Sequence, residues 1–382
     1  MAMHSLIFDA VSEATPGPAW LARWRASWPA YEAWFRAQGG DDGPSRVECE
    51  TALATHMPEL MPVYRRLTSL AGGADRASRF LSTWCPPRYL GGCSIAALED
   101  SGAVRLVRNY DLSPDLNEGL LLRSEWSGRP VMGMVEFLWG LSDGVNARGL
   151  SAALAYGGRS AVNRGFGVTT IIRYVLETCA TVPEAIAALR RVPSHMAYNI
   201  VLADRHGDTA TVELAAGGGA RVLRPAIATN HQHGTTAADR PEFTRTIERL
   251  SQLKRLMGAG VSLRALSDAF LEAPLFQRNY DAGFGTLFTA IYDPQRGALT
   301  LRWQGEDWHQ SLDTFVVDSR TISYGASAVP ATAAVGSFDL EAMFRTIRPF
   351  LSPRGVAALD DFAREARWVN ADWSRFGQCF GL

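Results

Sequence analysis

Cys93 is the residue whose surroundings point most directly to chemistry. It follows two glycines, Gly91 and Gly92, and precedes a short stretch, 94–98, that is typical of a β-strand. Glycine lacks a Cβ, so it allows backbone conformations that other residues resist and leaves the Gly92 carbonyl open to attack. The pattern predicts a thiol nucleophile at the start of a strand, beside a peptide bond that can be cut.

A polar pair follows on the next predicted strand. Residues 99–102 have turn chemistry, and residues 103–107 form a second strand-like stretch. The resulting hairpin returns Arg108 and Asp111 towards Cys93. There Arg108 would hold the region of the thiolate positive, and Asp111 would accept a hydrogen bond from an amine on Cys93. A structural ion pair between Arg108 and Asp111 is the alternative interpretation.

Cutting the chain between Gly92 and Cys93 would place an α-amine beside the thiol. An α-amine has a reference pKa of about 7.7–8.0, and a cysteine thiol one of about 8.5. The amine can therefore accept the thiol proton near neutral pH and later protonate a leaving amine. One residue then supplies both nucleophile and base. A small buried cysteine without chemistry is the competing interpretation.

Two asparagines at predicted strand ends are candidate oxyanion donors. Asn146 lies in a glycine-bounded turn, 144–149, and Asn230 follows a strand-like stretch. Preorganised side-chain donors can contribute roughly 3–4 kcal/mol to the transition state of acyl transfer. Ordinary turns are the alternative, since asparagine tolerates the left-handed backbone conformation.

The elements that would position these residues change character near residue 90. Earlier residues favour helices, with aromatic side chains at helical spacing (Trp20, Trp24, Tyr31 and Phe35) that indicate a face packed on the rest of the protein. Ser45 and Glu48 form a capping box that opens one of these helices. Strands are expected at 94–98, 103–108, 119–124, 131–136, 149–155, 197–203, 209–214, 285–292 and 298–303. Helices are expected at 167–179, 183–191, 241–257, 262–272, 338–348 and 353–367. This order predicts layered sheets covered by helices.

Composition excludes several classes of protein. The 382 residues carry a net charge of −1, so nothing favours binding to nucleic acid or to an anionic membrane surface. No apolar run approaches the ~20 residues that span a bilayer, and the N-terminus lacks the pattern of a secretion signal. Five widely spaced cysteines without a CxxC pair fit a reducing compartment, so we expect a cytoplasmic location. Lys254 is the one lysine among many arginines, a bias typical of a GC-rich, bacterial genome.

Taken in order, these motifs resemble the isopenicillin-N acyltransferase (acyl-coenzyme A:6-aminopenicillanic acid acyltransferase) family. This family is a branch of the N-terminal-nucleophile (Ntn) hydrolases, related to choloylglycine hydrolase and penicillin V acylase. The resemblance spans residues 90–305, and the segment before it is similar in length and position to the pro-region of that family. The motifs are Gly92-Cys93, Arg108-Asn109-Tyr110-Asp111, the turn from Gly144 to Asn146, Thr229-Asn230-His231, and Thr286-Leu287-Phe288 leading to Asp293.

The resemblance implies a fold of the α+β class. Residues 93–382 would form a four-layer αββα sandwich, the catalytic domain and β chain. Residues 1–92 would form a helical pro-region, or α chain, that self-cleavage separates between Gly92 and Cys93. We expect the fragments to stay associated, because the aromatic face of the first segment needs a surface to bury against.

The resemblance also assigns roles to individual residues. Cys93 is the nucleophile, Arg108 and Asp111 support it, and Asn230 lines the oxyanion hole, with Asn146 as a second candidate there. The family places a further active-site arginine shortly before the Thr-Leu-Phe strand, and Arg278 is the nearest candidate.

The predicted activity is that of an autoproteolytic cysteine hydrolase or acyltransferase. An acyl-enzyme on Cys93 would pass its acyl group to water or to an amine. The expected substrate is a small acyl amide or acyl thioester, and no cofactor, metal, nucleic acid or membrane is expected to take part. The sequence leaves open whether the protein forms a homo-oligomer.

Two other functions remain as alternatives. Residues 140–144 match the Gly-x-Ser-x-Gly elbow of serine α/β-hydrolases, with Ser142 as nucleophile. That elbow requires a helix directly after it, and the glycines at 144 and 149 argue against one. The second alternative is a non-enzymatic relative that stays uncut and acts as a binding partner. His231 and His233 lack acidic partners in sequence, which favours a loop over a metal site.

Overall fold

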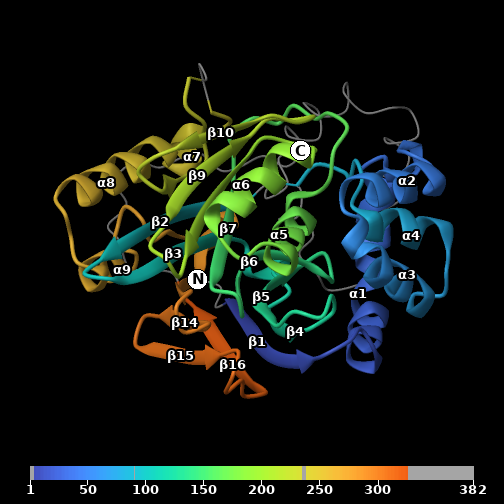
Figure 1. Ribbon diagram of the computed structural model, residues 1–382, viewed down its shortest axis with the longest axis horizontal. Coiled ribbons are helices and arrows are strands. Elements are labelled where there is room, and N and C mark those ends of the chain that lie inside the picture. The colour runs from blue at the N-terminus through green and yellow to red at the C-terminus, as the bar shows by residue number, and fades with distance from the viewer. Residues whose placement is uncertain (1–3, 90, 235–237, 326–382) are drawn as a thin grey trace.

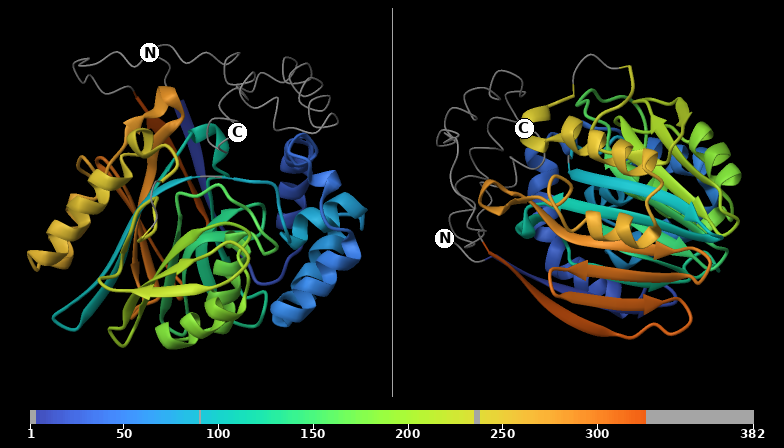
Figure 2. Two further views of the ribbon diagram at one scale, coloured as in Figure 1. Left: turned by 90° about the horizontal axis from the view of Figure 1, so that it is seen from above. Right: turned by 90° about the vertical axis from the view of Figure 1, so that its left-hand side faces the viewer.

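The fold is built on two β-sheets that face each other (Figure 1 and Figure 2). The computed structural model describes residues 4–89, 91–234 and 238–325. The first sheet has nine strands in the order β10 (Ala220–Leu223), β9 (Thr209–Leu214), β8 (Tyr198–Asp204), β7 (Leu150–Tyr156), β6 (Gly140–Asn146), β5 (Val131–Glu136), β4 (Leu120–Ser124), β1 (His4–Glu13) and β16 (Asp318–Tyr324). The second has seven, in the order β11 (Ile227–Ala228), β2 (Gly92–Asp100), β3 (Ala103–Leu112), β13 (Phe284–Asp293), β14 (Ala298–Trp303) and β15 (Glu306–Ser311), with β12 (Arg278–Asn279) paired to β13.

An apolar core fills the space between the sheets. Successive side chains of a strand point to opposite faces, so every second residue of each strand can enter this core. The second sheet contributes Ile95, Leu106 and Leu287, and the first contributes Val145 and Val201, all fully buried. Cys93 belongs to the same core, so its side chain points between the sheets.

Helices cover the outer face of each sheet. α5 (Val168–Thr178) and α6 (Val182–Arg191) pack on the first sheet. α8 (Thr246–Gly258) and α9 (Leu263–Ala269) pack on the second, where Leu253 and Leu266 contact Ala96 and Val107. The order of layers is helix, sheet, sheet, helix, which confirms the predicted αββα sandwich. No helix of the described residues combines the length and apolar character needed to cross a membrane.

The segment before Cys93 is mostly helical, as predicted. Its helices are α1 (Pro18–Ala37), α2 (Arg46–His56), α3 (Met61–Leu70) and α4 (Asp75–Ser82), which stand together at one side of the sandwich (Figure 1). The capping box of Ser45 and Glu48 is present at the start of α2. Trp24 stacks on Trp28 with ring centroids 4.4 Å apart, and both contact Phe80 of α4. The aromatic spacing therefore marks a packed face, as expected.

Strand β1 was not expected from the sequence. It lies inside the first sheet, parallel to β4 and antiparallel to β16. Its partners follow it by more than a hundred residues, and its apolar residues do not alternate cleanly, so no local pattern marks it. The segment before Cys93 thus supplies a strand to the sandwich as well as a group of helices.

Smaller differences concern the ends and breaks of elements. The helix expected at 241–257 is divided into α7 (Pro241–Thr244) and α8, because Arg245 between them has a φ of 51°. β6, β10, β15 and β16 were also not expected. The helices expected at 338–348 and 353–367 lie outside the described residues. Short 3₁₀ turns occupy Gly40–Asp42, Pro58–Leu60, Pro114–Leu116 and Tyr280–Ala282.

Replacing Phe8 tests whether β1 is part of the core. Phe8 is 0 % exposed, and its ring lies 5.1 Å from the ring of Trp303 and 5.9 Å from that of Phe288. We expect Phe8→Ala to lower the free energy of unfolding by about 3–5 kcal/mol, measured by urea denaturation of a Cys93→Ala chain. Ile7 is 56 % exposed, so the matched change Ile7→Ala should cost no more than about 0.5 kcal/mol. Equal losses would contradict the placement of β1.

Candidate active site

Cys93 lies near the start of β2, opposite Tyr110 of β3, and is 1 % exposed. Gly92 before it is required by packing. A Cβ at this position would lie 2.3 Å from the ring of Phe284 and 3.0 Å from the Cβ of Asp111. The glycine therefore permits β2, β3 and β13 to meet closely at the bond that precedes the thiol.

The thiol faces an arginine. Arg108 donates from Nη2 to the Sγ of Cys93 at 3.2 Å and from Nη1 to Asp143 of β6. Asp143 also accepts a hydrogen bond of 2.5 Å from the hydroxyl of Tyr292. Arg108 and Tyr292 belong to the second sheet and Asp143 to the first, and the arginine and the aspartate are fully buried. The ion pair therefore joins the two sheets directly behind the sulfur atom.

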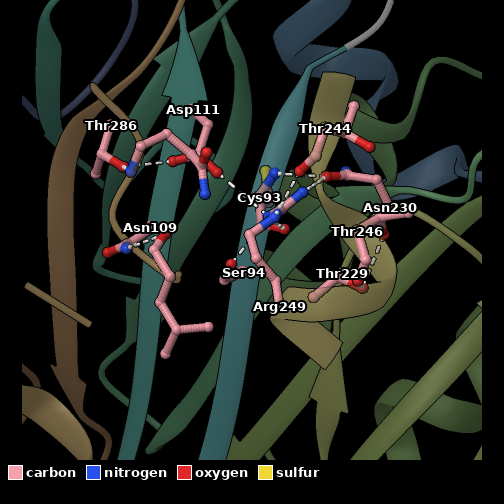
Figure 3. A network of polar contacts seen from close by, with 12 residues as sticks. Cys93, Ser94, Asn109, Asp111, Thr229, Asn230, Thr244, Thr246, Arg249 and Thr286 are labelled. Atoms are coloured by element: carbon pink, nitrogen blue, oxygen red, sulfur yellow. Dashed lines mark hydrogen bonds and ion pairs between the residues drawn. The ribbon is translucent and has the colours of Figure 1, made fainter. Parts of the chain in front are cut away.

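The backbone of Cys93 is held from the other face of β2, by Arg249 of α8 (Figure 3). Nη1 of Arg249 donates to the carbonyl of Cys93 at 2.5 Å and to the hydroxyl of Ser94 at 2.9 Å. The same nitrogen lies 3.3 Å from the carboxylate of Asp111, which accepts a second hydrogen bond, of 2.7 Å, from Thr286. Asp111 thus lies beside the backbone of Cys93 and pairs with Arg249, not with Arg108.

Asn230 completes this network. Its Oδ1 accepts a hydrogen bond from the backbone N–H of Cys93 at 3.1 Å and another from Nη2 of Arg249 at 2.5 Å. Its Nδ2 donates to the carbonyls of Gly91 and Tyr156, both at 3.3 Å. The amide of Asn230 therefore contacts the backbone on both sides of the Gly92–Cys93 bond.

Asn146 lies elsewhere. Its Nδ2 donates to the carbonyls of Leu176 and Cys179, at 2.7 and 2.8 Å, and its Oδ1 accepts from the backbone N–H groups of Arg148 and Leu150. Every hydrogen bond of the side chain thus joins the turn after β6 to the end of α5. These are the contacts of an ordinary turn asparagine, and none of them involves Cys93.

Arg278, the candidate for a further active-site arginine, lies at the surface. It lies exposed on β12, with its guanidinium 5.2 Å from the centre of the Phe276 ring. The buried arginine that contacts the backbone of Cys93 is Arg249, which the sequence did not single out. No local sequence pattern marks Arg249, because α8 reaches Cys93 only by folding back over the second sheet.

Ser142 does not form a nucleophile elbow. It lies in the middle of β6, is buried, and is followed by four more residues of the strand and then by β7. The elbow requires a helix at that point. The histidine pair also separates: the Nδ1 atom of His231 lies 2.9 Å from the hydroxyl of Thr246, and that of His233 lies 3.0 Å from Glu213.

Burial controls the protonation of the site in the uncut chain. Desolvation raises the pKa of the Cys93 thiol to about 11, although the charge of Arg108 opposes the rise. Burial likewise raises the pKa of Asp111, opposed by Arg249 and by the hydrogen bond from Thr286. The thiol is therefore protonated at neutral pH, and a base must take its proton before it can attack.

A cavity of about 320 Å³ lies beside the thiol. Cys93 and Gly91 contribute to its wall, together with Tyr31 of α1, Glu136 at the end of β5 and Tyr198 of β8. Residues from both sides of the Gly92–Cys93 bond thus enclose the same space.

Removing the charge of Arg108 should raise the pKa of the Cys93 thiol further. An opposite charge at this distance shifts a pKa by about one unit or more, so Arg108→Gln should slow the alkylation of Cys93 by iodoacetamide at pH 8 by at least about tenfold. Peptide mass spectrometry gives the rate for each cysteine. Cys85, a free and half-buried thiol, is the internal control. Arg105→Gln, on the same strand, is the matched variant and should leave the rate unchanged. An unchanged rate in Arg108→Gln would refute the role of its charge.

Breaking the pair between the sheets should be costly. Asp143→Asn leaves the buried guanidinium of Arg108 without its counter-ion, and we expect a loss of about 3–5 kcal/mol in the free energy of unfolding. Tyr292→Phe removes one hydrogen bond to Asp143 and should cost only about 1–2 kcal/mol. Both are measured by denaturation of a Cys93→Ala chain. Losses below 1 kcal/mol in Asp143→Asn would show that the pair does not hold the sheets together.

Three solved structures that match this chain are distant from it in sequence. Penicillin V acylase from Agrobacterium tumefaciens is 14% identical, with a TM-score of 0.40 over 61% of this chain and 92% of that chain. A variant of conjugated bile acid hydrolase from Clostridium perfringens is 14% identical, with a TM-score of 0.37 over 64% and 100%. The Caenorhabditis elegans orthologue of N-acylethanolamine-hydrolyzing acid amidase is 18% identical, with a TM-score of 0.42 over 60% and 99%. Comparison with curated protein sequences gives no match.

Family comparison gives a direct assignment. The sequence model that describes acyl-coenzyme A:6-aminopenicillanic acid acyl-transferase matches residues 97–308, which is more than half of the chain. The matched region includes the strands that carry Arg108, Asp111 and Thr286, and the helix that carries Arg249. The chain belongs to the acyl-coenzyme A:6-aminopenicillanic acid acyl-transferase family.

Proposed function

We propose that this protein is an autoproteolytic cysteine enzyme that hydrolyses an acyl amide or transfers an acyl group to an amine. One observation carries the proposal. The thiol of Cys93 contacts Arg108 and adjoins a cavity, while Asn230 and Arg249 hold the backbone N–H and carbonyl of the same residue.

The first reaction would be the cut between Gly92 and Cys93. The thiol attacks the Gly92 carbonyl and loses its proton, the peptide C–N bond breaks, and the nitrogen of Cys93 takes that proton to become a free amine. Water then opens the resulting thioester, which leaves a carboxylate on Gly92 and returns the thiol. Asn230 orients the scissile bond through the N–H of Cys93, and Arg249 fixes the carbonyl that follows it.

Turnover would use the new α-amine as the base. The amine takes the thiol proton, and Arg108 stabilises the thiolate by its charge. The thiolate attacks the acyl carbonyl of a substrate, and the leaving amine takes the proton. Water or a second amine then attacks the acyl-enzyme and releases the acyl group.

Asn230 is the proposed oxyanion donor of this reaction. In the uncut chain its Nδ2 donates to the carbonyls of Gly91 and Tyr156 at 3.3 Å, which is long for a strong hydrogen bond. After the cut, movement of the new chain end at Gly91 and Gly92 away from Asn230 would leave an N–H free to stabilise the oxyanion. Arg249 acts as a positioning residue, because it holds both Asn230 and Asp111.

The two fragments would stay together after the cut. β1 forms backbone hydrogen bonds with two strands of the first sheet, and the aromatic face of α1 shares one apolar core with α5. Residues 1–92 are therefore proposed as a permanent α chain of the enzyme and not as a discarded segment.

One cysteine variant and one serine variant distinguish the candidate nucleophiles. Cys93→Ala should lower the hydrolysis of a panel of acyl p-nitroanilides by roughly 10⁴-fold or more, because it removes the proposed nucleophile that forms the acyl-enzyme. Ser142→Ala, the matched control for the serine alternative, should retain activity within about threefold. Full activity in Cys93→Ala would contradict the proposed mechanism. An inactive wild-type chain that stays uncut would favour the non-enzymatic alternative.

A further inference from the structure

The cavity beside Cys93 has features that restrict the acyl group it can take. Its volume of about 320 Å³ is at the lower end of the range of ligand pockets, roughly 300–1,000 Å³. One wall is a face of α1 that carries the small residues Ala26, Ser27 and Ala30. The acyl group becomes bonded to the sulfur of Cys93, which lines the cavity, so the acyl part of the substrate occupies this space.

The cavity is acidic. Asp115, Glu118 and Glu136 line it, and no arginine or lysine is among its lining residues. Glu118 already has partners, because it accepts hydrogen bonds from the hydroxyl of Tyr31 and from the backbone N–H of Leu138. Glu136 differs in one oxygen: its carboxyl has a hydrogen bond with the side chain of Tyr110, but its Oε1 is buried and has no hydrogen-bond partner among the described residues. A buried carboxyl oxygen without a donor indicates a place where a donor on a ligand belongs.

The other walls suit a cation. Tyr31, Tyr89, Phe137, Tyr156 and Tyr198 surround the space with aromatic side chains. Aromatic faces attract an ammonium group, and a carboxylate neutralises it. Burial raises the pKa of Glu136 to about 7, so the free carboxyl is partly protonated at neutral pH and a bound cation favours its ionised form.

We propose that this cavity selects acyl groups that carry an ammonium group, with Glu136 as the counter-ion. The inference rests on the proposed function in one respect, the assignment of the occupant as the acyl part of the substrate. An acyl group ending in a methyl group leaves the Oε1 atom of Glu136 without a donor, and one ending in a carboxylate is repelled by the acidic lining.

Two amides that differ in one group test this selection. 5-Aminopentanamide and hexanamide have the same length and differ only in an ammonium group against a methyl group. Isothermal titration calorimetry on the full chain carrying Cys93→Ala measures binding without turnover. We expect 5-aminopentanamide to bind at least about tenfold more tightly than hexanamide.

Variants of Glu136 assign the preference. Glu136→Gln keeps the shape and removes the charge, so the preference should disappear while the affinity for hexanamide stays, which also shows that the variant is folded. Glu136→Asp keeps the charge and should keep the preference. Glu272→Gln, at an exposed site, is the matched control and should change nothing.

The outcomes separate this inference from the proposed function. Equal or tighter binding of hexanamide, or a preference that survives Glu136→Gln, overturns the role of Glu136. Tight binding of 5-aminopentanamide in a protein that neither cuts itself nor hydrolyses amides supports this inference and counts against the proposed function alone.

Discussion

The buried guanidinium of Arg108 is the interaction on which the rest of the site depends. A charged group at 0 % exposure is tolerated only when it has close partners, and here these are the thiol of Cys93 and the carboxylate of Asp143. Because Asp143 belongs to the opposite sheet, the same pair fixes the separation of the two sheets at the nucleophile. The same ion pair therefore contributes both to the packing of the two sheets and to the orientation of the thiol.

Two buried arginines contact different parts of Cys93. Arg108 faces the sulfur between the sheets, and Arg249 faces the backbone from the helical layer. The alternation of side chains along β2 and β3 creates this division, since Cys93 and Arg108 point inward while Asp111 points to α8. One face can thus hold the nucleophile and the opposite face the bond to be cut.

Local patterns were sufficient for part of this arrangement. The hairpin that brings Arg108 and Asp111 to Cys93 follows from adjacent strands and a short turn, and the capping box at Ser45 is a rule of four residues. The helical layers and the αββα fold also followed from periodicity and resemblance. Each of these features depends either on residues that are close in the sequence or on motifs that occur in a fixed order.

Contacts between segments that are distant in the chain could not be predicted from the sequence. Asp143 and Arg249 join Cys93 only after the sheets and α8 have packed, and β1 has partners far along the chain. At Asn146 the sequence pattern of an oxyanion donor and that of a turn asparagine are alike, and only the folded chain shows that its side chain bonds the end of α5.

The central claim is that Cys93 becomes an N-terminus, and intact mass under denaturing conditions tests it most directly. The account predicts two fragments, one ending at Gly92 and one starting at Cys93. A purified, catalytically active protein that remains a single chain would contradict it.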